Sequence, residues 1–279
     1  MPSIGAGDSG QPPPEIDTST PSVARVYDAV LNGKDNFAVD RAVRDQLLEI
    51  QPEGLVLPRD NRAWLTRVVR YLSDVVGIDQ FLDCGSGLPT ADNTHQIAQR
   101  ANPQARVVYV DNDPVVLAHG RALLEENAVT RFVAGDVRHP RQLLSDPAMR
   151  QLLDFDRPVG LLHAGILHHV LDEDGPLDVL AGYLDALAAG SHLAISHFHN
   201  PRDGSEVADA AQRAEQVLVG GELGSGTFRS PAEIERFFDG LELLDPGVVF
   251  LADWRPDVAE RHPLAVPRQL MLGGLARKP

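Results

Sequence analysis

The chain has 279 residues, of which 43% are hydrophobic, so it can bury one sizeable core with room for a small appendage. Its formal net charge of -15 and its isoelectric point near 5.0 argue against a nucleic-acid partner, because phosphate binding relies on clustered lysine and arginine. The single cysteine, Cys84, excludes an internal disulfide and a thiolate metal cage.

The N-terminal segment and the lengths of the apolar runs indicate where in the cell the protein is expected. No basic-then-apolar signal segment opens it, and no apolar run approaches the length of a membrane span. We therefore expect a cytoplasmic protein that has no membrane partner and acts on a small-molecule substrate. The oligomeric state stays open.

The N-terminal part of the chain changes character after residue 20. Residues 1–20 are rich in Gly, Ser and Pro and carry little apolar content, which is typical of a disordered tail. Apolar residues then recur at helical spacing and predict three helices before the first strand. These helices are expected over residues 23–33, 39–50 and 59–77.

Strands and helices alternate through the rest of the chain. Continuous apolar runs, separated by helical segments such as 93–100 and 114–127, indicate a parallel sheet that is covered on both faces. The strands are expected at 80–83, 106–111, 131–136, 159–164 and 192–197. Two further strands, at 241–251 and 268–276, are predicted to form a terminal hairpin.

The glycine-rich stretch 81–90 (FLDCGSGLPT) follows the first strand and leads into a helix. Such a turn lets backbone N–H groups and a helix N-terminus face a ligand. A dinucleotide fingerprint needs a third glycine where this chain has Thr90, and Pro89 intrudes. The spacing of Asp83, Gly85 and Gly87 instead resembles the first motif of S-adenosylmethionine (SAM) methyltransferases. A glycine turn without a ligand is the structural alternative.

Three consecutive strands are predicted to end in an aspartate. The first, second and third predicted strands close with Asp83, Asp111 and Asp136. An acid at the end of the second strand is where a doubly wound sheet binds ribose hydroxyls. The alternative is N-capping of the helices that follow, a role we also expect for Asp113 before Pro114. Because all three acids stand at the expected ends, we favour a nucleoside-containing ligand.

A wider resemblance covers nearly the whole chain after the tail. The segments 22–28 (SVARVYD), 33–37 (GKDNF), 61–62 (NR), 70–72 (RYL), 81–90, 109–114 (YVDNDP) and 237–241 (FFDGL) resemble a bacterial family of stand-alone S-adenosyl methyltransferases. The resemblance implies a class I methyltransferase-like α/β fold, which is a doubly wound, mostly parallel sheet of seven strands with the last antiparallel. It also implies SAM as cofactor and an N-terminal helical cap over it, but no particular substrate. The expected units are the tail 1–20, the cap 21–77 and the SAM-binding domain 78–279.

The same resemblance implies a set of cofactor-binding residues. The glycine loop and Asp83 would hold the amino-acid part of SAM, Asp111 the ribose, and Asp136 with Val137 the adenine. The cap residues Tyr27 and Arg62 are candidates for the SAM carboxylate or for closing the site, although Tyr27 is equally suited to core packing. The complete implied set is Asp83, Gly85, Ser86, Gly87, Asp111, Asn112, Asp136, Val137, His163, Ala164, Tyr27 and Arg62.

Four histidines lie near the carboxyl ends of the predicted fourth and fifth strands. An oxygen or amine acceptor of high pKa needs a base, and His197, His199 and His168 are the candidates. For His168 and its neighbour His169 the alternative is a packing role. A metal site built from His197, His199 and Asp203 is a weaker alternative, since two histidines without a fixed third ligand carry little information. We assign no metal.

The predicted function is methyl transfer from SAM to a small-molecule acceptor. The acceptor would lie between the cap and residues 200–230, where glycines at 220–226 predict a flexible loop able to close. Two alternatives are a SAM-binding sensor and a non-methylating SAM enzyme that performs an intramolecular displacement. A nicotinamide dehydrogenase is a more distant alternative.

Overall fold

The structure, a computed structural model, describes residues 16–89, 92–124 and 128–279. Most of the predicted tail, Thr90 and the end of the predicted helix 114–127 lie outside these residues. The boundaries at 21–77 and 78–279 stay predictions.

Between residue 16 and the first strand the structure has three α-helices, as expected. They are α1 (Val23–Val30), α2 (Ala38–Ile50) and α3 (Val56–Tyr71). Ser22 caps α1 by accepting the Arg25 amide, and α2 begins where the Phe37 amide donates to Asp40 (2.8 Å). Helix α3 begins earlier than predicted because Pro58 fits in a first turn, where no backbone N–H is needed. A π-helical segment, Leu72–Val76, extends it to Gly77.

The sheet is doubly wound and mostly parallel, as predicted. It consists of β1 (Gln80–Cys84), β2 (Arg106–Asp111), β3 (Thr130–Ala134), β4 (Gly160–Ala164), β5 (His192–Phe198), β6 (Glu242–Leu243), β7 (Val249–Phe250) and β8 (Met271–Arg277). The strand order is β3-β2-β1-β4-β5-β8-β6, and only the pairs made by β8 are antiparallel. The order reverses between β1 and β4, which is where such sheets bind ligands.

The last strands differ from the predicted seven-stranded sheet with a terminal hairpin. The segment predicted as one strand at 241–251 is split into β6 and β7, and both pair with β8, along its two ends. The split falls at Pro246, which has no N–H to donate, and Gly247, whose φ is 89°. The sheet therefore has eight strands, with β6 and β7 following one another along one edge.

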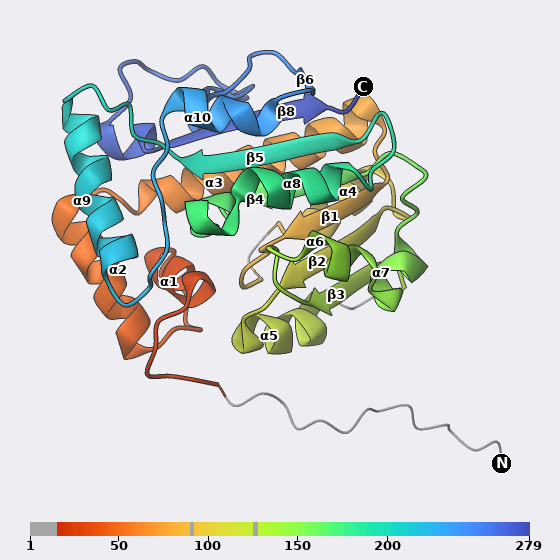
Figure 1. Cartoon of the computed structure of the whole chain (residues 1–279), viewed down its shortest axis with the longest axis horizontal. Coiled ribbons are helices and arrows are strands. Elements are labelled where there is room, and N and C mark those ends of the chain that lie inside the picture. The colour runs from red at the N-terminus through yellow and green to blue at the C-terminus, as the bar shows by residue number, and fades with distance from the viewer. Residues whose placement is uncertain (1–15, 90–91, 125–127) are drawn as a thin grey trace.

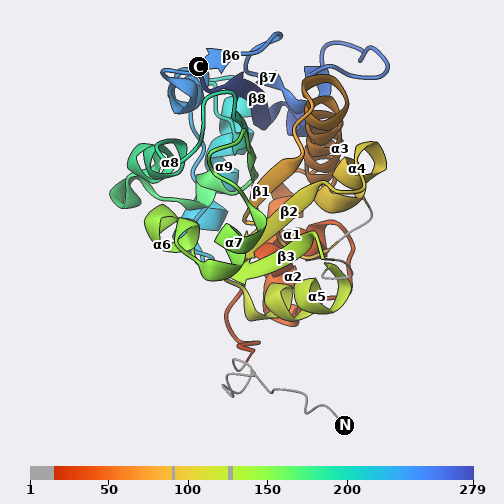
Figure 2. The same cartoon turned by 90° about the vertical axis from the view of Figure 1, so that its right-hand side faces the viewer.

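Helices cover both faces of the sheet, as Figure 2 shows. On one face lie α3, α4 (Thr94–Ala101) and α5 (Pro114–Leu124); on the other lie α6 (Pro140–Leu144), α7 (Pro147–Leu152) and α8 (Pro176–Leu184). The two remaining α-helices of the described chain are α9 (Glu206–Gly220) and α10 (Pro231–Glu235). In the core on the α3 face, the buried rings of Trp64 and Trp254 meet edge to face, with centroids 6.4 Å apart.

Helices α1 and α2 of the predicted cap pack with α9 beyond the carboxyl ends of the parallel strands (Figure 1), whereas α3 lies on the sheet face. Val26 of α1 and Val43 of α2 form a third apolar cluster with Ala210, Ala211 and Ala214 of α9. Burial of these side chains holds α1 and α2 above the strand ends. Among the described helices, none is long and apolar enough to cross a membrane.

Candidate functional site

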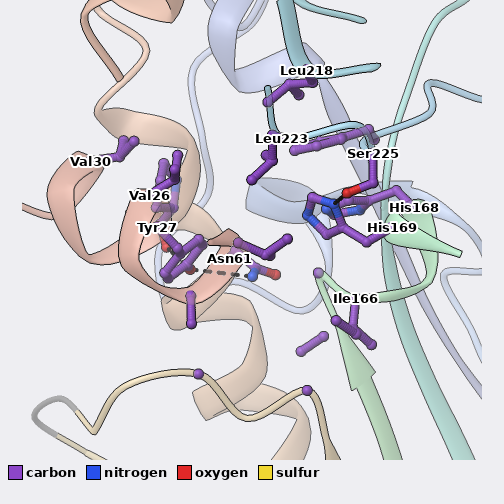
Figure 3. A pocket seen from close by; sticks show the side chains of 18 of the residues that line it. Val26, Tyr27, Val30, Asn61, Ile166, His168, His169, Leu218, Leu223 and Ser225 are labelled. Atoms are coloured by element: carbon purple, nitrogen blue, oxygen red, sulfur yellow. Dashed lines mark hydrogen bonds between the residues drawn. The ribbon is translucent and has the colours of Figure 1, made fainter. Parts of the chain in front are cut away.

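A cavity of about 470 Å³ lies between the carboxyl ends of the strands, the cap and α9. Its size is in the usual range for a small-molecule site. At one end it is lined by the glycine loop and the predicted acids. At the other end it is lined by apolar side chains of α1, α2 and α9, and by two histidines (Figure 3). A single cavity therefore joins the two regions.

The two glycines of the loop have different surroundings. Both adopt the left-handed conformation, with φ of 67° at Gly85 and 65° at Gly87. A Cβ on Gly85 would lie 2.4 Å from Cγ1 of Ile166, so this glycine lets the segment after β4 approach the loop. A Cβ on Gly87 would meet no protein atom within 4 Å. Gly87 is therefore the position at which a ligand can come close to the backbone. Ser86, between them, also lines the cavity.

Asp83 lines the cavity from the end of β1 and is only 5% exposed. Burial raises the pKa of Asp83 to about 6, while the hydrogen bond that Thr94 Oγ1 donates (2.6 Å) and the charge of Arg62 act to lower it. Among the described residues Thr94 is the one hydrogen-bond donor to this buried carboxyl group, which leaves it poorly compensated as an anion. The ammonium of an amino-acid ligand would supply the missing charge.

Asp111 ends β2 and is held by the backbone. Its Oδ2 accepts the Gly87 amide (2.9 Å) and its Oδ1 accepts the Asp113 amide (3.0 Å). Burial raises the pKa of Asp111, and the backbone amides oppose that effect. Asn112 follows it in the cavity wall, and Asp113 caps α5, as predicted, by accepting the Val115 amide (2.7 Å).

Asp136 lies two residues beyond β3 and not within the predicted strand, because β3 ends at Ala134. Both of its oxygens accept from Arg138, which also reaches Asp174 (3.3 Å). Burial acts to raise the pKa of Asp136, but the Arg138 hydrogen bonds and charge outweigh it and hold the pKa below its usual value. Asp136, Val137 and Arg138 all line the cavity.

The cap contributes Tyr27 and Arg62 to the cavity wall. The Tyr27 hydroxyl donates to the Pro58 carbonyl (3.1 Å) and receives a long hydrogen bond from Asn61 Nδ2 (3.4 Å). Asn61 in turn accepts from the hydroxyl of Ser196 on β5 (2.6 Å). This chain of polar contacts ties α1 and α3 to the sheet, and Asn61 lies on the cavity side of it (Figure 3).

His163 is placed differently from the other implied cofactor residues. Ala164 lines the cavity, but the His163 side chain is not part of its wall. The ring is fully buried and packs edge to face against Tyr183, with centroids 5.2 Å apart. Burial lowers the pKa of His163 to about 3, so the ring is neutral. A role for its side chain in binding the cofactor therefore has no support from this arrangement.

Two of the three predicted catalytic histidines also lie outside the cavity wall. His197 is fully buried, and its ring is held by the Phe198 carbonyl (2.8 Å) and by Arg229 (2.7 Å). His199 contacts the Gln269 carbonyl through Nδ1 (2.8 Å). Neither ring has contact with the cavity, so the predicted proton-transfer role has no support at these positions. His168 and His169 do line the cavity.

No group of three or more metal-binding side chains is formed within the part of the chain that the structure describes. The alternative metal site of His197, His199 and Asp203 is therefore not assembled.

Comparisons with known proteins agree with this geometry. Residues 9–279 match the model of the family described as S-adenosyl methyltransferase. The chain belongs to this S-adenosyl methyltransferase family. It is 45% identical to a candidate methyltransferase from Thermobifida fusca YX, with a TM-score of 0.89 over 97% of this chain and 99% of that one. It is 38% identical to a DUF574 family protein from Streptomyces avermitilis MA-4680, with a TM-score of 0.88 over 95% and 100%. No curated protein matches the chain.

Family membership confirms the expected enzyme class and cofactor. The protein is a SAM-dependent methyltransferase with the class I α/β fold. A SAM sensor or a non-methylating SAM enzyme is not favoured. The cavity fits the cofactor in one further respect. The buried carboxyl group of Asp83 and the backbone of Gly87, which no protein atom crowds, line the same cavity.

Some cavity residues of the methyltransferase were not assigned a role from the sequence. Asn61 stood within a segment of the family resemblance, and Arg138 follows Asp136 by two positions. The sequence near both residues could therefore have pointed to a place in the cavity wall. Ser225 had none beyond the glycines around it. Its place depends on how the segment after α9 folds back over the cavity.

Proposed function

We propose that this methyltransferase transfers the methyl group of SAM to a small-molecule acceptor bound in the same cavity. The observation that carries the proposal is the continuity of the cavity from the glycine loop to the apolar region under the cap. Bound SAM supplies an already activated methyl group. The protein has mainly to align acceptor, methyl carbon and sulfur, and such positioning can be worth roughly 7 to 11 kcal/mol of the barrier.

Within this proposal the cofactor residues divide by ligand part. Asp83 and the loop Gly85–Ser86–Gly87 hold the amino-acid part, with the Ala164 backbone nearby. Asp111 accepts from the ribose, while Asn112, Asp136 and Val137 bind the adenine. Tyr27 and Arg62 close the amino-acid end from the cap. The supporting fact is that these side chains or backbones line one cavity.

We also propose that nucleic acid is not a substrate and that the protein is cytoplasmic. The net charge of -15 supports the first point, since a phosphate backbone is repelled by such a chain. The lone, buried and reduced Cys84 fits a reducing compartment.

The test is binding followed by transfer. Titration calorimetry of the full chain with S-adenosylhomocysteine should show one site. Incubation with SAM tritiated in its methyl group and a small-molecule extract should place label in the organic fraction. An Asp111→Ala variant should lose both signals, because the ribose loses its acceptor and the loop its anchor. Tight binding with no transfer to any extract would contradict the proposal, as would label in added nucleic acid.

A further inference from the structure

The end of the cavity beyond the glycine loop is apolar. Its wall includes five partly buried hydrophobic side chains that pack against the third apolar cluster, which α1, α2 and α9 form. They are Val30, Leu47, Leu57, Phe198 and Leu223. Apolar surface left uncovered inside a cavity favours an apolar ligand. We call this region the acceptor end.

Charge is distributed unevenly along the cavity. Its carboxylates, at Asp83, Asp111, Asp113, Asp136 and Asp174, stand in or near the glycine loop and the ends of β2 and β3. Among the described residues, Arg44 is the charged side chain in the wall of the acceptor end. It pairs with Asp45 (2.7 Å). A cationic acceptor would find no counter-ion there, and an unpaired buried charge is costly.

Of the two histidines in this region, His168 and His169, only the ring of His169 is oriented by a side-chain hydrogen bond among the described residues. His169 is oriented by Ser225, whose Oγ lies 2.9 Å from Nδ1 (Figure 3). With Nδ1–H donating to Ser225, the lone pair on Nε2 is free to accept a proton. Among the residues that the structure describes, Nε2 has no hydrogen-bond partner. The backbone fixes the segment, because the His169 amide donates to the Ile166 carbonyl (2.9 Å) and Thr227 donates to the His168 carbonyl (2.8 Å).

Beside His169 stands a column of flat rings. His168 stacks on Phe198, with centroids 3.6 Å apart and planes at 19°, and Phe198 stacks on Phe228 at 4.6 Å and 11°. All three line the cavity. Aromatic ligands pack well against such rings, either stacked or edge to face.

We propose that the acceptor is an uncharged, flat aromatic molecule that carries a hydroxyl group, and that His169 binds this hydroxyl through Nε2 and takes its proton. The proposal rests on the proposed function and specifies its substrate class. The acceptor oxygen forms a bond to the methyl carbon as the carbon–sulfur bond breaks and its electron pair returns to sulfur. The O–H electron pair stays on oxygen while the proton moves to Nε2, and the imidazolium later releases it to solvent.

The environment of His169 suits this role. Burial lowers the pKa of His169 to about 4, which keeps the ring neutral near neutral pH and makes it a weak base. It therefore accepts a hydrogen bond from the hydroxyl first, and takes the proton as methyl transfer makes that O–H strongly acidic. A phenolic hydroxyl is also uncharged near neutral pH, whereas an aliphatic amine is cationic. The apolar wall and the neutral base therefore select the hydroxyl over the amine.

The first experiment uses three probes that share one ring. The full chain, saturated with S-adenosylhomocysteine, is titrated with β-naphthol, β-naphthylmethylamine and β-naphthoate near neutral pH. We expect β-naphthol to bind about tenfold or more tightly than the cation, which has no counter-ion in this region. It should also bind more tightly than the anion, because Arg44 is already paired with Asp45. Equal or tighter binding of either charged probe, or no binding of β-naphthol, would overturn the proposal.

The second experiment tests the base. With SAM and β-naphthol, His169→Gln should form β-naphthyl methyl ether about a hundredfold more slowly than the parent protein. Its affinity for S-adenosylhomocysteine should be unchanged. The matched control is His262→Gln, since the His262 side chain is 55% exposed and lies outside the cavity. Ser225→Ala should slow transfer less, and Ser225→Thr should restore it.

The outcomes separate the two proposals. If wild-type protein binds S-adenosylhomocysteine but the probes do not discriminate, or His169→Gln transfers at the parent rate, the acceptor proposal fails and the proposed function stands. If β-naphthol binds but is never methylated, the assignment of the base fails. If S-adenosylhomocysteine does not bind at all, the proposed function fails and this inference fails with it.

Discussion

The Gly87 amide donates to the Asp111 carboxylate at 2.9 Å, which joins the loop after β1 to the end of β2. The same carboxylate accepts the Asp113 amide (3.0 Å). Both carboxylate oxygens of Asp111 therefore accept a backbone hydrogen bond in the protein without ligand. Because each carboxylate oxygen can accept more than one hydrogen bond, these contacts orient Asp111 and leave acceptor capacity for a ligand.

The two loop glycines should respond differently to alanine. Both substitutions strain a left-handed backbone by about 1–2 kcal/mol. Gly85→Ala also drives a methyl group into Ile166, so it should lower the melting temperature more. Gly87→Ala places its methyl in open space where the ligand is expected, so it should weaken S-adenosylhomocysteine binding about tenfold or more. Calorimetry and thermal melts of both variants check this. Equal affinity loss in the two would contradict the assignment of Gly87.

Ionised Asp83 should lower the stability of the ligand-free protein, although the same charge is expected to bind the ligand. Burial raises its pKa to about 6, so the ionised form destabilises the ligand-free fold above that pH. The penalty, on the order of 3 kcal/mol, fades as the pH falls below 6 and is gone below about pH 4, where the unfolded chain is protonated too. Asp83→Asn should therefore raise the melting temperature at pH 8 and not at low pH. Chemical unfolding across this pH range provides the measurement.

The same carboxylate sets a pH dependence of ligand binding. The SAM ammonium needs the ionised form, so affinity in the parent protein should fall as the pH drops through about 6. In Asp83→Asn the affinity should be at least about a hundredfold weaker and nearly independent of pH. An unchanged dissociation constant in the variant would show that Asp83 does not hold the ammonium.

The strand ends could be predicted from the sequence because their signals are local. Apolar runs fix the strands, a parallel sheet brings the carboxyl ends together, and Asp83 and Asp111 therefore reach one cavity. The side of the sheet to which a residue on a buried strand points has no such local signal in the sequence. On β5, Ser196 faces Asn61 and the cap, while His197 faces Arg229 and Phe237. Since both faces of this strand are buried, no polar alternation marks the cavity side.

Ser225 illustrates the second limit of sequence reasoning. It follows α9 in a stretch without regular periodicity. It lies 56 positions from His169 along the chain, yet the structure places the two in hydrogen-bond contact. That approach depends on the contact between Thr227 and His168 and on packing of Leu223 in the cap cluster. Such tertiary contacts leave no pattern along the chain. The split of β6 from β7, by contrast, had a readable signal in Pro246 and Gly247.

Arg138 should support adenine binding by orienting Asp136. The pair is partly exposed, with 44% of Arg138 and 23% of Asp136 accessible, so its contribution is screened. Arg138→Ala should weaken S-adenosylhomocysteine binding by up to about fivefold. Arg157→Ala is the control, because that arginine makes a comparable exposed pair with Asp79 (2.7 Å) outside the cavity wall and should leave affinity unchanged. Tighter binding in Arg138→Ala would instead mean that the guanidinium obstructs the adenine position.

Ser22 should couple the cap to the cofactor end of the cavity. Its hydroxyl caps α1 by accepting the Arg25 amide (3.3 Å) and donates to Asp113, which caps α5 next to Asn112. Ser22→Ala should cost about 1 kcal/mol of stability and also weaken S-adenosylhomocysteine binding several-fold, since the cap loses a tie to the end of β2. Ser205→Ala is matched to it, because Ser205 caps α9 at the same distance (3.3 Å, from the Ala208 amide). Ser22→Ala should melt at a somewhat lower temperature than Ser205→Ala, because it also loses the hydrogen bond to Asp113, and only Ser22→Ala should bind the ligand more weakly. If both bind it as the parent does, the contact between Ser22 and Asp113 stabilises the fold without contributing to the site.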